Sequence, residues 1–307
     1  MLFGNLMNNY FYGKAGKGDY RIEDMPANRF QLFKATLGVR WGSMIGLNLL
    51  YLLIWIPAIV WTFVNYLVLE NSFAEGSAYA YNLGYVTLYL LGMILCIGIT
   101  GPFTAGISYV TRNWARDQHS FMLSDFWDAV KGNWKQALGI SFITGFVPFI
   151  AYTGWAFYGD KVSESLFFVV PLGLVLMMAL VWFLSLSLTY TMMVTYKLRF
   201  RDLLRNTVLM TIARLPQALG IKLAAFAITI IAFLLIWFIP SIQMYVLLVW
   251  CLYYAVFGFS FSRMLYSAYA NAQCEKYINT RIEGAETNIG LRPENWDDTE
   301  YRPEDDE

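Results

Sequence analysis

The sequence has little charge. Asp, Glu, Lys and Arg make up 14% of its 307 residues, and hydrophobic residues make up 58%. Soluble domains carry about 25% charged residues, so this chain lacks the polar side chains needed to cover a surface that faces water everywhere. The composition therefore argues against a soluble domain and predicts an all-α polytopic membrane protein.

Residues that commonly carry catalysis or bind metals are also scarce. His119 is the only histidine, and the three cysteines, Cys96, Cys251 and Cys274, have no paired spacing. Neither a disulfide framework nor a zinc site follows from such a pattern. No Ser, Cys or second carboxylate stands at a telling distance from His119, so no nucleophile–base pair is predicted. We therefore expect a protein that is not an enzyme and that uses no cofactor and no metal ion.

Six apolar runs are long enough to cross a membrane. The hydrocarbon core of a bilayer is about 30 Å thick and needs roughly 20 apolar residues of helix. The runs cover residues 42–69, 83–111, 136–158, 166–195, 218–239 and 242–262. The last two are separated by the short turn PSIQ, in which Pro240 cannot continue a helix. The sequence thus predicts six transmembrane helices.

The basic residues predict the orientation of these helices. When they are assigned to the loops and tails, 21 of the 22 Lys and Arg residues fall on one side, and Lys161 alone falls on the other. Basic residues gather in cytoplasmic loops, so we predict a multi-pass protein with both termini in the cytoplasm. This assignment places Lys222 just inside the fifth span, where its side chain can snorkel to the surface, and Arg263 in the C-terminal tail.

The middle of each predicted span lacks charged residues. Ion- and proton-coupled carriers usually have such residues, because these groups form the ion pathway. The spans instead hold Asn, Ser and Thr together with many aromatic residues. These groups could line the path of a sugar, or they could only hold neighbouring helices together, which is their ordinary role.

Amphipathic segments precede the first, third and fifth spans. Their apolar residues recur at spacings of three and four, as in Phe30, Phe33 and Leu37, which places them on one helical face. Short motifs also recur, since WKQALGI at 134–140 returns as LPQALGI at 215–221. One interpretation is a threefold repeat, in which each unit is a cytoplasmic amphipathic helix followed by a helical hairpin. The other is chance similarity between apolar runs of restricted composition.

The second span contains a glycine–proline pair with small and polar residues around it. Proline removes a hydrogen bond from a helix, and Thr100 could cap a second half-helix that begins at Pro102. Broken helices of this kind form substrate sites in transporters. The alternative is a tolerated kink beside a small-residue packing face. The candidate ligand or packing site consists of Thr100, Gly101, Pro102, Thr104 and Gly106.

The cytoplasmic side of the predicted bundle offers a surface for a protein partner. Tryptophans there could instead anchor the amphipathic segments in the lipid interface, and arginines mark where the spans leave the bilayer. The residues of this candidate partner surface are Arg112, Arg116, Trp127, Trp134, Arg205 and Arg214. We expect contact with the lipid bilayer and no binding of nucleic acid, because the basic residues are spread along the membrane face.

Three regions follow from these patterns. Residues 1–27 form a cytoplasmic N-terminal tail, and residues 28–282 form the six-helix membrane domain. Residues 283–307 form an acidic cytoplasmic tail, which we expect to be disordered because of its charge and its prolines.

The stretch GPFTAGISYVTRNWARDQHSFMLSDFWDAVKGNWKQ, residues 101–136, resembles the YesL-like family of bacterial integral membrane proteins. The residues that match the family pattern are Gly101, Pro102, Thr104, Ala105, Gly106, Tyr109, Val110, Arg112, Asn113, Asp125, Phe126, Asn133, Trp134, Lys135 and Gln136. The resemblance extends over roughly residues 28–282 and weakens in the last two spans. It implies a bacterial plasma-membrane protein whose relatives are often encoded beside sugar ABC importers and glycoside hydrolases. It implies no catalytic residue.

Two functions are expected from the sequence and the resemblance together. The first is a non-enzymatic accessory protein for carbohydrate uptake, which contacts the subunits of a sugar ABC importer. The second is a facilitative or exchanging transporter of a sugar or small polar solute. A polar cavity inside the six-helix bundle distinguishes the two, because the transporter requires one.

Overall fold

The computed structural model describes residues 25–74 and 83–293. Within these residues the chain is helical or irregular and contains no β-strand, which confirms the all-α prediction. The principal helices are α2 (Arg29–Ala74), α3 (Leu83–Trp114), α4 (Met122–Val162), α5 (Val169–Thr195), α6 (Phe200–Ala213), α7 (Leu215–Phe238), α8 (Gln243–Tyr253) and α9 (Phe259–Tyr277). A five-residue π-helix, η5 (Tyr254–Gly258), joins α8 to α9.

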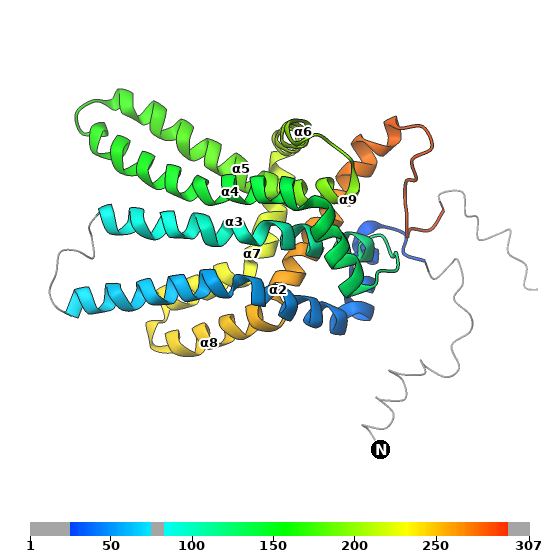
Figure 1. Cartoon of the computed structure of the whole chain (residues 1–307), viewed down its shortest axis with the longest axis horizontal. Helices are drawn as coiled ribbons and strands as arrows, with labels where there is room; N and C mark the ends of the chain where they lie inside the picture. The colour runs from blue at the N-terminus through cyan, green and yellow to red at the C-terminus, as the bar shows by residue number, and fades with distance from the viewer. Residues whose placement is uncertain (1–24, 75–82, 294–307) are drawn as a thin grey trace, which may run out of the picture.

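Six helical stretches are long and apolar enough to cross a membrane. Five of them correspond to α2, α3, α4, α5 and α7, and the sixth runs from Pro240 through α8, η5 and α9 to Arg281. The helices α2, α3, α4 and α5 lie along a common direction, and α7 and α9 run obliquely to them (Figure 1). The described chain begins and ends at the same end of the bundle (Figure 1). The prediction of a multi-pass membrane protein with six spans is confirmed.

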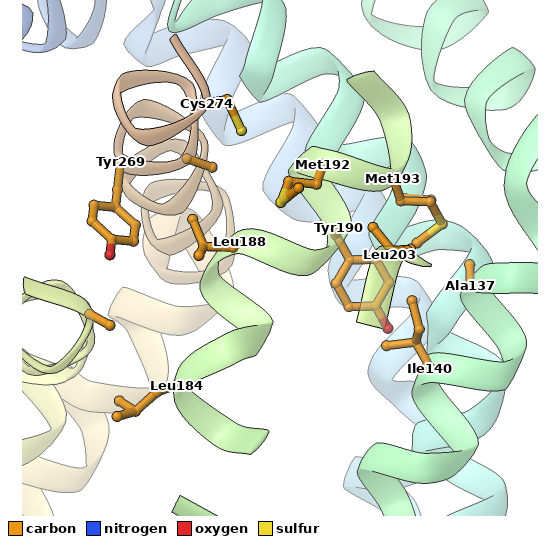
Figure 2. Close-up of a cluster of buried hydrophobic side chains, with 13 residues drawn as sticks. Ala137, Ile140, Leu184, Leu188, Tyr190, Met192, Met193, Leu203, Tyr269 and Cys274 are labelled. Atoms are coloured by element: carbon orange, nitrogen blue, oxygen red, sulfur yellow. The ribbon is translucent and has the colours of Figure 1, made fainter. Parts of the chain in front are cut away.

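The outer surface of the bundle is apolar, as a lipid environment requires. Large side chains such as Phe63, Met178 and Phe233 are more than half exposed. The side chains buried between the helices form two clusters. The first joins α2 and α3 to the beginning of α4 and to α9. In the second, side chains of α5 such as Leu188 lie between α4 on one side and α9 on the other (Figure 2).

Glycines bring α3 and α4 into close contact. A Cβ atom at Gly101 would overlap the carbonyl oxygen of Ala137 and the hydroxyl of Ser141. A Cβ atom at Gly145 would lie 2.8 Å from the Cα atom of Ile94. Two helices can approach so closely only where small residues face each other, as in many membrane helix pairs. These glycines therefore fix the spacing of the α3–α4 hairpin.

The amphipathic segments predicted before the odd-numbered spans adopt two arrangements. The first two are the opening turns of α2 and α4 and continue into the span without a break. The third is a separate helix, α6, which is viewed nearly end-on in Figure 1 and so lies across the bundle. The chain breaks at Arg214, shortly before Pro216, which has no N–H to donate to the preceding turn. A separate amphipathic helix thus occurs once among the described residues.

Residues near the C-terminus pack against the end of the bundle where α2 begins. Glu275 in α9 forms an ion pair with Arg29 at the start of α2. The Arg29 guanidinium also donates a hydrogen bond to the carbonyl oxygen of Ile289, at 2.8 Å. Residues 283–293, the first part of the region that we expected to be a disordered acidic tail, therefore contact the membrane domain. The rest of that region, and most of the N-terminal tail, lie outside the described residues.

Candidate functional site

A cavity of about 680 Å³ lies between the helices. Its walls come from α2, α3, α4, α5, α7, α8, η5 and α9. Small-molecule sites in proteins have volumes of about 300–1,000 Å³, so this cavity is large enough for a solute the size of a sugar. A cavity between the helices is therefore present, with a lining that is mostly apolar and includes several polar side chains.

Aromatic rings form much of the cavity wall. Trp55 of α2 stacks on Phe259 of α9, with ring centroids 5.7 Å apart and an interplanar angle of 14°. Trp250 of α8 lies against Tyr254 of η5, with centroids 5.1 Å apart. Binding sites for small molecules are commonly walled by such rings, with a few polar groups that fix the orientation of the ligand.

Hydroxyl groups provide the neutral polar part of the wall. The hydroxyls of Tyr51 and Thr104 lie 2.6 Å apart and link α2 to α3. The hydroxyls of Ser141 and Tyr190 lie 2.8 Å apart and link α4 to α5, and Tyr190 reaches from α5 toward α4 in Figure 2. Thr104 also donates to the carbonyl oxygen of Thr100, at 2.8 Å, so Tyr51 is the donor in the first pair and both protons of that pair are used. In the second pair one hydroxyl proton stays available for a solute. These pairs can hold helices together and also face a ligand.

Two cationic side chains face the cavity from neighbouring helices. Lys222, the eighth residue of α7, is 6% exposed, and its Nζ lies 4.3 Å from the ring centroid of Phe183 and 4.5 Å from that of Tyr266. The guanidinium carbon of Arg263, near the start of α9, lies 5.2 Å from the ring of Tyr190. Among the described residues, neither cation forms an ion pair.

The positions of these two cations correct the sequence analysis. Lys222 was expected to snorkel to the surface, but α7 packs it against α5 and α9. Arg263 was expected in the C-terminal tail, but the sixth span continues through α9, which ends at Tyr277. No charged residue lies in the middle of a predicted span, but Lys222 and Arg263 line the cavity from near the ends of the fifth and sixth predicted spans. A periodic signal existed: Lys222, Phe226 and Thr229 all line the cavity and are spaced as one face of a helix.

Asn48 holds the part of the wall that η5 forms. Its side chain is fully buried, and its Nδ2 donates to the carbonyl oxygens of Tyr254, at 2.9 Å, and Ala255, at 2.8 Å. Its Oδ1 accepts from the N–H groups of Phe259, at 2.9 Å, and Ser260, at 3.0 Å. A π-helix interrupts the regular backbone ladder, and such interruptions are frequent at functional sites. Asn48 supplies partners for four backbone groups at this interruption.

The residues of the glycine–proline motif divide between the cavity and the helix contact. The helix α3 continues through Pro102, so of the two interpretations the broken helix does not form and the packing face does. Thr100 and Thr104 line the cavity. Gly101 packs against the backbone of α4, and a Cβ atom at Gly106 would lie 2.8 Å from a ring carbon of Phe126. The motif therefore packs α3 onto α4 and also presents two hydroxyls to the cavity.

The predicted partner surface is only partly exposed. Its exposed members are Trp127, Trp134 and Arg205. Arg116 is buried, and the half-buried Arg112 donates a hydrogen bond to the carbonyl oxygen of Val194, at 3.0 Å. The guanidinium of the half-buried Arg214 donates to the hydroxyl of Tyr277. Arg112 and Arg214 thus form contacts at the end of the bundle, and the surface left for a partner is smaller than predicted.

The remaining residues that could carry chemistry lie apart from the cavity or stand alone. His119 is exposed in the α3–α4 loop, where its ring lies 4.6 Å from that of Phe121. Cys251 lines the cavity and is a free thiol. In the part of the chain that the structure describes, no group of three His, Cys, Asp or Glu residues could hold a metal ion.

Comparison with known proteins identifies the segment that contains the glycine–proline motif. Residues 44–155 match the family described as "Protein of unknown function, DUF624". The DUF624 segment runs from Met44, in the second third of α2, through α3 and most of α4. That family includes the YesL-like proteins, which agrees with the resemblance seen in the sequence, but its description gives no activity. No match was found among curated proteins or among solved structures.

Proposed function

We propose that this chain is a non-enzymatic plasma-membrane protein that transports a sugar or another small polar solute by facilitated diffusion or exchange. The observation that carries the proposal is the 680 Å³ cavity, walled by aromatic rings and by hydroxyl groups from several helices. In this proposal both termini lie in the cytoplasm, since the loops at the end of the bundle where the described chain begins and ends are rich in Lys and Arg.

Transport requires that the cavity open to each side in turn, and the α7–α8 hairpin is suited to move. None of the residues of α8 is buried, and α8 joins α9 through the π-helix η5. Small rotations at such an interruption tilt the attached helix without breaking the rest of the bundle. In this mechanism Asn48 is the fixed point against which the hairpin moves.

Solute counterflow into proteoliposomes tests this proposal. Purified protein is reconstituted with an internal excess of one unlabelled sugar, and entry of the same labelled sugar is followed across a panel of neutral and charged sugars. Ser262→Phe places a ring in the cavity, because Ser262 lines it and is only half-buried. Ser124→Phe is the matched control, because Ser124 is exposed at the start of α4.

The proposal predicts counterflow for at least one solute with the unmodified protein and with Ser124→Phe. Counterflow of that solute is lost with Ser262→Phe. If the unmodified protein moves no member of the panel, or if Ser262→Phe moves the solute at the same rate, the cavity is not a transport pathway.

An accessory role in carbohydrate uptake is the second candidate. It is supported by the exposed tryptophans Trp127 and Trp134 and by a groove of about 680 Å³ between α6 and α9, lined in part by Leu209 and Met210. A sugar ABC importer is the partner that the family resemblance implies. Copurification of importer subunits with the tagged protein would support this role. Arg205→Glu should reduce the copurification, and Lys161→Glu, at the other end of the bundle, should leave it unchanged. Isolation without importer subunits in every preparation would argue against it.

A further inference from the structure

Two basic side chains line the cavity, and no carboxylate lines it with them. Lys222 and Arg263 both line the cavity, and the ring of Tyr266 contacts both, with centroid distances of 4.5 Å to the Lys222 Nζ and 5.7 Å to the Arg263 guanidinium carbon. The cavity is lined by described residues alone, and none of them is Asp or Glu. The two cations are thus close together in an interior without a carboxylate.

Among the described residues, the contacts of Lys222 include no anionic group. Its neighbours are the faces of Phe183 and Tyr266, and a cation–π contact contributes only about 0.5–2 kcal/mol while the charge remains. Lys222 lies about 10 Å along α7 from the first residue of that helix. Charged groups buried in a membrane protein are otherwise paired, and they mark substrate or ion pathways.

The groups that line the cavity with the two cations carry no negative charge. Phe183 and Tyr190 of α5 contact Lys222 and Arg263, and Tyr51 of α2, Thr104 of α3 and Ser141 of α4 belong to the same wall. Hydroxyl groups can donate hydrogen bonds to an anion, but they cannot supply the missing negative charge. A bound anion would supply it, and it would relieve the mutual repulsion of Lys222 and Arg263.

We propose that the part of the cavity beside Lys222 and Arg263 binds the anionic group of a small solute, a carboxylate or a phosphate, while the aromatic rings contact the rest of the solute. The inference rests on the proposed function of the cavity as a solute site, and it names the class of solute: a sugar acid or sugar phosphate rather than a neutral sugar. Arg263 offers a planar fork of donors that suits a carboxylate or phosphate, and Lys222 offers a point charge. The headgroup of an anionic lipid carries the same chemistry and is the other source of such a group.

Binding of glucuronate and of glucose to the whole protein tests this inference. The two solutes differ in charge through the carboxylate at C6. The protein is placed in nanodiscs of phosphatidylcholine at fixed ionic strength, and Kd and the shift in Tm are measured for each solute. A second set of nanodiscs contains phosphatidylglycerol and identifies a lipid headgroup as the occupant. The variants are Lys222→Met and Arg263→Gln, and Lys131→Met is the control because Lys131 is exposed on α4.

The inference predicts that glucuronate raises the Tm and binds at least about tenfold more tightly than glucose, the ratio expected from one charge-assisted hydrogen bond. Lys222→Met and Arg263→Gln each abolish this preference, and Lys131→Met keeps it. Lys222→Met also raises the Tm of the protein without solute, because an unpaired buried charge is replaced by an apolar side chain of similar length. If phosphatidylglycerol raises the Tm and prevents the glucuronate effect, the anionic group belongs to a lipid.

Other outcomes overturn the inference. Equal affinity for glucose and glucuronate, without an effect of phosphatidylglycerol, would leave the cavity as a solute site and remove the anion preference. If neither solute nor the anionic lipid changes the Tm while a different, neutral sugar shows counterflow, transport stands and the anion site does not exist. A preference for glucuronate that persists in both Lys222→Met and Arg263→Gln would place the anion elsewhere.

Discussion

Replacement of Asn48 by Leu tests whether one buried amide fixes the wall of the cavity. The substitution keeps the size of the side chain and removes all its hydrogen bonds. The N–H groups of Phe259 and Ser260 and the carbonyl oxygens of Tyr254 and Ala255 then lose the partner that Asn48 provides. An unpaired buried polar group costs about 1–3 kcal/mol. Carbonyl oxygens tolerate this loss better than N–H groups, so the two N–H groups set the expected cost at about 2–6 kcal/mol.

This loss in the free energy of unfolding is measured in mixed micelles. Sodium dodecyl sulfate is added stepwise, and helicity is followed by far-UV circular dichroism. Asn133→Leu is the matched control, because the amide of Asn133 donates within its own helix, to the carbonyl oxygen of Ala129 at 2.9 Å. We expect the control to lose less than about 1 kcal/mol, as for most substitutions away from buried networks. If Asn48→Leu lost no more than Asn133→Leu, the π-helix would not depend on Asn48, and the hinge suggested for η5 would lose its fixed point.

Three further substitutions and one control variant test the packing and electrostatics of the bundle in the same unfolding assay. Gly101→Ala should lower the free energy of unfolding by about 1–3 kcal/mol, because its Cβ would meet the backbone of α4. Its control, Gly132→Ala, should raise the free energy of unfolding by about 0.5–1 kcal/mol, because the space around Gly132 is open. Glu275→Gln should lose about 2 kcal/mol because it leaves Arg29 without its buried partner. Burial raises the pKa of Tyr196, so at high pH the folded protein keeps a proton that the unfolded chain releases. The free energy of unfolding should therefore fall as the pH rises through about 10, the ordinary pKa of tyrosine. Tyr196→Phe should lessen that fall.

The controls for these predictions come from exposed positions. Lys161 and Glu164 form an ion pair at the surface, 2.8 Å between Nζ and Oε1. Glu164→Gln should therefore change the stability by less than about 1 kcal/mol. A loss as large as that of Glu275→Gln would show that the assay responds to any missing charge. If Gly101→Ala left the free energy of unfolding unchanged, α3 and α4 would lie further apart than the structure places them.

The membrane spans could be predicted from the sequence because length and hydropathy alone determine them. Each of the six apolar runs lies in one of the six helical stretches. The boundaries of the amphipathic segments were harder to predict, because continuity depends on a local backbone break. Pro216 coincides with a break between α6 and α7, yet Pro57, Pro102 and Pro148 lie within continuous helices. Neighbouring helices in a membrane bundle can compensate for the lost hydrogen bond, so proline alone does not predict the break.

The site was harder to predict than the fold. Counting Lys222 and Arg263 with the basic residues of the loops gave a consistent topology, and this consistency hid their position inside the bundle. The π-helix at Tyr254–Gly258 has no pattern in the local sequence, and the side chain that bonds its backbone, Asn48, lies 206 residues before Tyr254. Residues from eight helical elements meet at the cavity, and the pairing of those elements is a property of the tertiary structure.

Chemical modification of a cysteine inside the cavity tests the central claim most directly. Ser262→Cys is made in a chain whose native cysteines, Cys96, Cys251 and Cys274, are replaced by Ala. Its rates of reaction with the anionic 2-sulfonatoethyl methanethiosulfonate and the cationic 2-(trimethylammonium)ethyl methanethiosulfonate are then compared. If the cavity admits polar solutes and Lys222 and Arg263 attract anions, we expect the anionic reagent to react about tenfold faster than the cationic one. We also expect glucuronate to slow the reaction with the anionic reagent. Absence of reaction with both reagents, or faster reaction with the cationic one, would contradict the account.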